Sequence, residues 1–169
     1  MKPAPKQALP TLTFSERIDL HMNGEDISII HPGVATTDGD CFAYFHRANV
    51  ISVGDLPAAL RYVAADASVS GNIDGQITAA ELIINTGDSD TKIVVGHGAP
   101  VISKKDARDH LDMLVAVRKS VMNAIQSGKS LEEVVASKPT TPFDERHKGG
   151  PGPDSFVKGV YTDLARKAR

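Results

Sequence analysis

The sequence predicts an α/β protein in which one mixed β-sheet carries helices packed mainly on one face. Short strand-like segments occupy the first third of the chain, and longer segments with helical periodicity occupy most of the rest. One further strand-like run lies between two of the helical segments. Strands followed by helices, with a strand among the helices, are typical of a mixed α/β layer.

The first two strands are expected to form a hairpin. Residues 17–22 and 26–31 alternate apolar and polar side chains, and Asn23-Gly24-Glu25 separates them. Alternation is typical of a strand with one buried face, and Asn-Gly is a strong signal for a tight hairpin turn. Residues 1–11, before the hairpin, are rich in proline and are expected to be irregular.

Three more strands are predicted further along the chain. Residues 41–46 and 50–53 are strand-like and are joined by a turn at 46–49. Residues 92–95 form an apolar run, which is typical of a strand in the interior of a sheet. We therefore expect five strands, with the fifth away from the edges of the sheet.

Helical periodicity and capping residues predict four helices. The first is expected over 78–85, and a long second helix over 103–127 closes at Gly128. A short third helix starts after Ser130 as its N-cap, and an amphipathic fourth helix covers 155–166. The long helix is expected to bury one apolar stripe, formed by Leu111, Leu114, Val115, Val117, Val121, Met122 and Ile125.

Composition is that of an ordinary globular protein. The 169 residues, 41% hydrophobic and 24% charged, are expected to form a single domain over 1–169. A net charge of −2 gives no reason to expect nucleic acid or a membrane as partner. Cys41 is the single cysteine, so no intrachain disulfide can form. No apolar run reaches the length of a membrane span and no signal peptide opens the sequence, so a cytoplasmic location is expected.

Three short strings place carboxylate or imidazole groups just past predicted strands. Residues 35–40 read Ala-Thr-Thr-Asp-Gly-Asp, residues 49–55 end in Gly-Asp, and residues 92–98 end in Gly-His-Gly. Strand ends are where α/β proteins build their sites, because the sheet positions the side chain while the loop opens it to solvent. A functional site is therefore expected where these strings meet.

Together these strings resemble the C-terminal half of the metallo-β-lactamase fold, a superfamily of zinc-dependent hydrolases. The resemblance extends from Leu9 to Tyr161, and the string at 128–140 is similar to the tail of one bacterial branch of these hydrolases. It implies that this chain forms half of a four-layer αββα sandwich. It also implies an apolar sheet face that the other half of the sandwich would cover. Some members of the family are exported from the cell.

The resemblance also implies roles for individual residues. Asp55 and His97 match two zinc ligands, Asp40 matches the carboxylate that orients the site loop, and Thr36 stands where the family has a histidine ligand. The H-x-H-x-D-H signature that opens the family's site does not occur in the sequence. A hydroxyl is a poor zinc ligand, and a hydrolytic zinc site needs about three protein ligands. His31, five positions before Thr36, is a candidate replacement ligand.

Each of these residues also has a purely structural explanation. Asp55 can cap the loop that follows it, since aspartate commonly accepts backbone N–H groups in turns. His97 lies between two glycines and can belong to a tight turn. Asp38 and Asp40 can support a turn, and His31 can simply lie at the surface.

A second candidate site is a calcium loop at residues 70–81. The oxygen-bearing residues Asn72, Asp74, Thr78 and Glu81 fall at positions 3, 5, 9 and 12 of the EF-hand template. Against this, position 1 is a serine instead of an aspartate, and the sequence contains no second loop to pair with this one. The alternative interpretation of the stretch is the N-terminus of a helix.

Two functions from different classes remain open. The first is a truncated, degenerate metallo-β-lactamase-like zinc hydrolase, ancestrally acting on ester, thioester or lactam bonds, and active at most with a separate N-terminal half or across a homodimer. The second is a non-catalytic binding or scaffold protein, with or without calcium at 70–81. Because an exposed apolar face promotes association, a two-fold homodimer is expected in either case.

Overall fold

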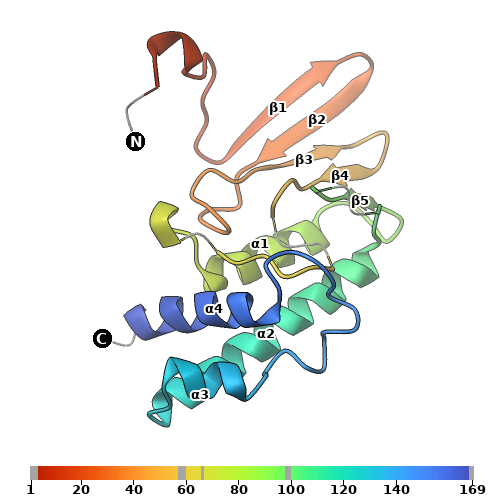
Figure 1. The fold of residues 1–169 in the computed structure, drawn as a ribbon. Helices are drawn as coiled ribbons and strands as arrows, with labels where there is room; N and C mark the ends of the chain where they lie inside the picture. Colours follow the sequence, from red (N-terminus) through yellow and green to blue (C-terminus); the bar gives the residue numbers. More distant parts are fainter. Residues whose placement is uncertain (1–3, 57–59, 66, 98–99, 168–169) are drawn as a thin grey trace.

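The computed structural model describes residues 4–56, 60–65, 67–97 and 100–167 (Figure 1). Its strands form one sheet in the order β1-β2-β3-β4-β5. The first four strands pair antiparallel with their neighbours and β4 pairs in parallel with β5, so the sheet is mixed, as predicted. The strands are β1 (Arg17–Met22), β2 (Glu25–Ile30), β3 (Phe42–Phe45), β4 (Val50–Ser52) and β5 (Lys92–Val94).

The hairpin between β1 and β2 forms as the sequence predicts. Asn23 and Gly24 have positive φ angles of 53° and 74°. Positive φ at both central residues is the backbone of the two-residue turn that matches the twist of the flanking strands. Asn49, with φ of 53°, lies in the predicted turn between β3 and β4.

Four α-helices accompany the sheet, and a capping box fixes where each of two of them begins. Ser103 and Asp106 form a capping box at the start of the second helix, and Ser130 and Glu133 form another at the start of the third. In each box the serine side chain and the acid each accept a backbone N–H that the helix would otherwise leave unpaired. The helices are α1 (Ile73–Asn85), α2 (Lys104–Gln126), α3 (Leu131–Ala136) and α4 (Pro153–Lys167), with 3₁₀ turns η1 (Lys6–Ala8) and η2 (Ala67–Val69).

The predicted interior position of β5 is wrong. β5 is the last strand of the sheet in the described part of the chain, and on its free side Ile93 forms only an isolated bridge with Ile102. The run is apolar for a different reason, because Ile93 and Val95 are buried at 0% and 7% exposure. Val94 between them points the other way and is 40% exposed.

Two helix predictions also need correction. α1 begins at Ile73, five residues before the predicted start, because the side chain of Asn72 accepts the N–H of Gly75 and caps the helix. In α2, Val115 is 44% exposed and does not belong to the buried stripe. At about 100° per residue, Val115 is rotated by about 120° from the middle of that stripe, which includes His110 instead.

The helices cover one face of the sheet, as predicted (Figure 1). Phe42, Ile51 and Ile93 point to this face and are 1%, 0% and 0% exposed. α1 packs on α2, and α4 packs on both α2 and α3, so the helices support one another beside the sheet. The hydrophobic core therefore lies between the helices and the β3–β5 end of the sheet.

The opposite face of the sheet is apolar, and none of its side chains belongs to this core. Side chains alternate along a strand, so the strand register determines which residues share this face. Among the described residues no helix lies on it. We call this surface the open sheet face; its apolar residues are Ile18, Leu20, Met22, Ile27, Ile29, Ala43, Phe45, Val50 and Val94.

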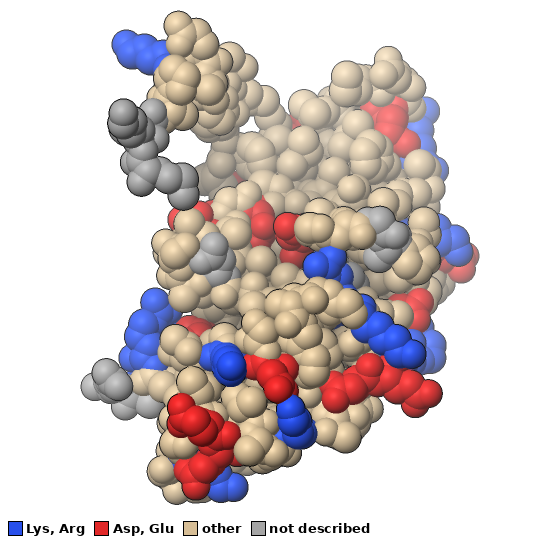
Figure 2. Space-filling view, viewed as in Figure 1, with Lys and Arg blue, Asp and Glu red and all other residues tan. Residues whose placement is uncertain are grey.

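Charged side chains of both signs mix over the helical part of the surface (Figure 2). No large region of a single sign is visible from this side, in keeping with the net charge of −2. In the described part of the chain no helix has the length and apolar character needed to cross a bilayer.

Candidate functional site

The candidate site lies where β4 and β5 end. These strands are parallel neighbours, so their carboxyl ends meet at the same edge of the sheet. Asp55 comes three residues after β4, and His97 comes three residues after β5. The parallel pairing thus brings together two polar residues that are far apart in the sequence.

Asp55 and His97 are in direct contact. The Nε2 atom of His97 lies 2.6 Å from Oδ1 of Asp55, and the two side chains are 54% and 55% exposed. The ends of β4 and β5 hold the backbones of the two residues in place, and both side chains are open to solvent. An imidazole and a carboxylate presented in this way are both suitable zinc ligands.

The two loops that carry the pair touch through their backbones. The N–H of Gly96 donates to the carbonyl of Gly54 at 2.9 Å. A Cβ on Gly96 would lie 2.7 Å from that carbonyl oxygen and 3.1 Å from Oδ1 of Asp55, so this approach requires glycine. His97 itself has a positive φ of 62°, which is uncommon for a residue with a side chain and is often found at functional sites.

Thr36 lies beside Asp55, but its hydroxyl group already has partners. Oγ1 donates to the backbone carbonyl of Asp55 at 3.2 Å and accepts from Nε2 of Gln76 at 3.2 Å. Thr36 is 8% exposed, and Gln76 on α1 is fully buried and also donates to the carbonyl of Val63. Sequence reasoning missed Gln76, because a glutamine within a helix carries no local signal that it is buried.

Asp40 and His31 organise the loop between β2 and β3. Oδ2 of Asp40 accepts the N–H of Thr37 at 2.7 Å. Nδ1 of His31 lies 2.8 Å from the backbone carbonyl oxygen of Asp40. His31 thus binds the loop backbone, and it does not form a ligand group with Asp55 and His97.

The described residues do not by themselves fit a catalytic zinc ion. No three of their His, Cys, Asp and Glu side chains come together in a way that could hold a metal. Asp55 and His97 supply two donors, and the hydroxyl of Thr36 is committed elsewhere. Since a hydrolytic zinc site uses about three protein ligands and one open position, a further ligand has to come from outside these residues.

Residues 70–81 do not form a calcium loop. α1 already begins within this stretch, so the oxygens of Asp74, Thr78 and Glu81 are spread along and around a helix instead of converging on one point. The side chain of Asn72 caps the helix. The stretch is therefore a helix N-terminus, the alternative interpretation of the sequence.

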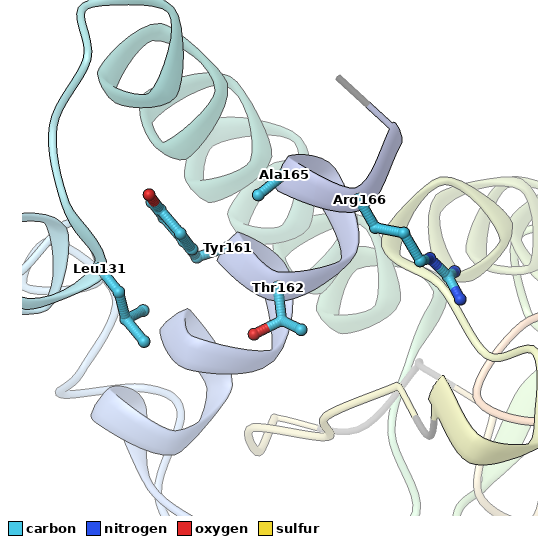
Figure 3. Close-up of a pocket in the computed structure, with 5 residues that line it drawn as sticks. All are labelled: Leu131, Tyr161, Thr162, Ala165 and Arg166. Carbon is cyan, nitrogen blue, oxygen red and sulfur yellow. The ribbon is translucent and has the colours of Figure 1, made fainter. Parts of the chain in front are cut away.

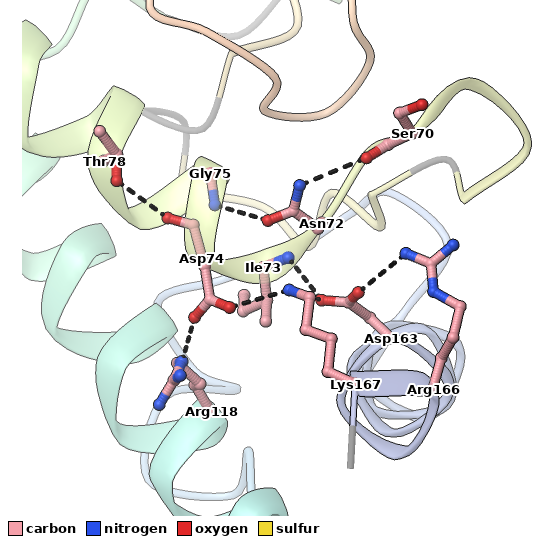
Figure 4. A network of polar contacts seen from close by, with 10 residues as sticks. All are labelled: Ser70, Asn72, Ile73, Asp74, Gly75, Thr78, Arg118, Asp163, Arg166 and Lys167. Carbon is pink, nitrogen blue, oxygen red and sulfur yellow. Dashed lines mark hydrogen bonds and ion pairs between the residues drawn. The ribbon is translucent and has the colours of Figure 1, made fainter. Parts of the chain in front are cut away.

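Asp74 instead belongs to a network of ion pairs (Figure 4). Its carboxylate pairs with Arg118 of α2 and, at 2.8 Å, with Lys167 of α4. Burial acts to raise the pKa of Asp74, but hydrogen bonds from Lys167 and Arg118 outweigh it and hold the pKa below its usual value. Asp163, 4% exposed, accepts the N–H of Ile73 at 3.1 Å and pairs with Lys167 at 3.1 Å. The network thus joins α1, α2 and α4.

A second polar cluster is buried between α2 and the loop before α4. The rings of His110 and His147 are 0% and 3% exposed, and their centroids are 5.3 Å apart. Burial lowers the pKa of His110 to about 3, with a further contribution from His147, and burial also lowers the pKa of His147. Beside them, Tyr62 donates to Asp144 at 2.6 Å. Sequence reasoning missed this cluster because its members are scattered along the chain.

Two grooves elsewhere on the described surface offer little chemistry. One, of about 320 Å³, lies along α4 and is lined by Leu131, Tyr161, Thr162, Ala165 and Arg166 (Figure 3). It contains neither an acid nor an imidazole. The other, of about 450 Å³, lies beside the N-terminal segment and includes His31, Asp38 and Cys41. Burial raises the pKa of the Cys41 thiol, which keeps the thiol in its less reactive protonated form.

Comparison with known proteins shows the fold. No protein-family model and no curated protein matches this chain. Among solved structures, the sec-alkylsulfatase Pisa1 from Pseudomonas sp. is similar over 90% of this chain and 26% of its own, with a TM-score of 0.72 and 14% identity. A double mutant of the same sulfatase matches over 92% of this chain and 26% of its own, with a TM-score of 0.72 and 16% identity.

A metallo-β-lactamase from Pontibacter korlensis is also similar, with a TM-score of 0.53 and 17% identity over 63% of this chain and 49% of its own. This chain therefore has an α/β fold of the metallo-β-lactamase type, as its sequence predicts. It spans half or less of the length of each of these structures. At 14–17% identity, this likeness shows the fold and assigns no reaction to the chain.

Proposed function

We propose that this chain contributes Asp55 and His97 to a metallo-β-lactamase-like hydrolytic centre that is completed by ligands from elsewhere. Those ligands would come from the other half of the sandwich, carried by a separate N-terminal half, or from a second copy of this chain. The reaction class is hydrolysis of an ester, thioester or lactam bond. In this proposal the chain by itself is a degenerate half-site without hydrolytic activity.

The contact between Asp55 and His97 is the observation that carries this proposal. The pair lies at the carboxyl ends of neighbouring parallel strands, where α/β proteins place functional groups, and more than half of each side chain is open to solvent. The positive φ of His97 is a strained backbone conformation, and the close approach of the two loops at Gly96 helps to hold the residue in it. Backbone strain of this kind often occurs at functional sites.

Zinc content tests the proposal. We would purify the chain without chelator and measure zinc per chain by elemental analysis, for the wild type and for Asp55→Asn and His97→Gln. Both variants should lose any zinc that the wild type retains. His21 and Asp26 provide a matched control, because they form another exposed histidine–aspartate contact of 2.6 Å, in the β1–β2 hairpin and away from the carboxyl ends of β4 and β5. Asp26→Asn should leave the zinc content unchanged.

Restoring the missing donor provides the converse test. Thr36→His places an imidazole where the resemblance implies a third ligand, beside the backbone of Asp55. Zinc retention should rise toward one ion per chain, since a hydrolytic zinc site is held by about three protein ligands and leaves its remaining position to water. If zinc content does not depend on Asp55 or His97 and Thr36→His does not raise it, the proposed half-site is refuted.

The second candidate function is a non-catalytic scaffold, and the hydrogen bonds of Thr36 favour it. The hydroxyl ties the loop before β3 to the backbone of Asp55 and to Gln76 on α1, which is a structural use of an old ligand position. On this hypothesis the Asp55–His97 contact serves only to hold two loops together. Asp55→Asn would then lower the thermal midpoint, while zinc would be absent from the wild type as well.

A further inference from the structure

We propose that His110 and His147 form an acid-sensitive clasp, which holds the loop between α3 and α4 against the rest of the protein at neutral pH and releases it on acidification. We call residues 137–152, which connect α3 to α4, the α3–α4 loop. His110 lies on α2 and His147 lies on this loop. The clasp does not involve the candidate site, so it stands independently of the proposed function.

The α3–α4 loop buries very few side chains. Among its residues, all of which the structure describes, Thr140 and His147 are the only buried ones, at 1% and 3% exposure, and both are polar. Phe143 and Asp144 are half-buried. Local opening costs least where few buried apolar contacts are lost, so this loop can detach without unfolding the rest of the chain.

His147 attaches the loop through its ring. The centroid of this ring lies 5.3 Å from that of His110 on α2 and 5.8 Å from that of Tyr62, which belongs to residues 60–65. Nδ1 of His147 lies 3.1 Å from the carbonyl oxygen of Phe143, so this nitrogen carries a hydrogen and donates it. The ring is thus bonded to its own loop and packed against two other segments of the chain.

Tyr62 makes two further contacts with the loop. Its hydroxyl group donates to Asp144 at 2.6 Å. The loop backbone comes so close at Gly150 that a Cβ there would lie 2.1 Å from the carbonyl oxygen of Tyr62. The carbonyl of Val63, next in the chain, accepts from Nε2 of Gln76 on α1 at 3.1 Å. The clasp therefore holds the segment that leads from the candidate site to α1.

The closed clasp has no place for an added proton. Both ring nitrogens of His110 and Nε2 of His147 are buried and have no hydrogen-bond partner among the described residues. A charged imidazole carries an N–H group on each nitrogen, and burying it without acceptors is costly. Two charged rings would in addition repel each other across 5.3 Å. A proton can therefore be taken up once the loop has moved away and admitted water.

The charged groups around the clasp do not offset this cost. Burial has the largest effect on the pKa of His147 and lowers it; Arg146 acts in the same direction, while the bond to the loop backbone, Asp109 of α2 and Asp144 of the loop act against it. Burial likewise lowers the pKa of His110 to about 3, and the neighbouring imidazole adds to this effect. The other rings in the cluster carry no charge; they belong to Tyr62, Phe143 and Phe156.

Acidification therefore favours the open state by a factor that can be calculated. In the open state both rings are in water and titrate near pH 6.5, whereas in the closed state His110 stays neutral down to about pH 3. Between about pH 7.5 and about pH 5, protonation of His110 in the open state multiplies the opening constant by about thirty. His147 increases the factor further, since its pKa is also lowered in the closed state.

Amide hydrogen exchange at about pH 7.5 and about pH 5, corrected for the intrinsic effect of pH on exchange, tests the clasp. The amides of Arg146 and His147 report on the loop, because both donate to the carbonyl of Phe143, at 3.1 and 3.0 Å. Their protection factors should fall by at least about thirtyfold on acidification and should lie well below those of the α2 amides at both pH values. Loop amides that exchange as slowly as those of α2 would overturn the clasp, because the loop would then open only when the whole chain unfolds.

Substitution of the two histidines identifies the titrating groups. In a double variant with His110→Leu and His147→Phe, which keeps apolar bulk at both positions, protection of the loop amides should change less than about threefold between the two pH values. His21→Gln is the matched control, because His21 is an exposed histidine on β1, and it should keep the full fall in protection. Each variant is compared with itself at two pH values, so a general loss of stability does not alter the result. A fall in protection that survives in the double variant would overturn the assignment to these histidines.

Discussion

Acidification should destabilise this protein through His110, and a single substitution isolates the effect. His110 is fully buried on α2, and burial lowers the pKa of its ring to about 3, whereas an unfolded chain titrates near 6.5. As the pH falls below about 6.5, the unfolded chain therefore binds a proton that the folded chain refuses. The stability contributed by neutral His110 is complete above about pH 6.5 and is lost progressively toward pH 3.

The size of the loss follows from the two pKa values. Each unit between them corresponds to about 1.4 kcal/mol, so lowering the pH from about 7.5 to about 5 should cost about 2 kcal/mol through His110 alone. The ring of His147 lies against that of His110, and the charged side chains of Asp109, Asp144 and Arg146 act electrostatically on His147. Because the pKa of His147 is also lowered by burial, the wild type should lose more than this in total.

Urea denaturation of the wild type and of His110→Leu at both pH values measures the effect. The difference in unfolding free energy between the two proteins should shift by about 2 kcal/mol in favour of the variant at the lower pH. Met113→Leu, at a neighbouring buried position without a titrating group, should change stability by the same amount at both pH values. A difference between the wild type and His110→Leu that does not vary with pH would refute the reasoning.

Two further substitutions test the packing that positions the site. Gly75→Ala should lower the free energy of unfolding by about 3 kcal/mol in a thermal unfolding assay, because the added Cβ would lie 1.8 Å from the carbonyl oxygen of Val34. Gly39→Ala is its control in the same assay and should be nearly neutral, because a Cβ there meets nothing within 4 Å. Asp163→Ala should cost about 2 kcal/mol, because it leaves the N–H of Ile73 without its acceptor. Asp112→Ala, an exposed position on α2, is its control in urea denaturation, and equal losses for the two alanine variants would argue against the role given to Asp163.

Much of the fold could be predicted because its signals act over a few residues. Asn23-Gly24 fixes the hairpin turn through its own backbone preferences, and the serines at 103 and 130 start their helices by accepting an N–H three residues ahead. Asp55 and His97 could be selected for the same reason, since each follows a strand that its own neighbours define. The hairpin turn and the helix caps could be predicted because both partners of each contact are close together in the chain, whereas the contact between Asp55 and His97 depends on the pairing of β4 with β5.

The remaining features depend on partners that are distant in sequence. The local sequence around Asp74 matches a calcium-loop template, but in the structure its carboxylate pairs with Lys167, 93 positions away, and with Arg118. The position of β5 at the sheet edge and the burial of His110 against His147 were likewise decided by which segments pack together. Local preferences fix backbone conformation within one turn or strand, whereas the partner of a charge or a ring is chosen by the packing of the whole chain, which minimises exposed apolar area.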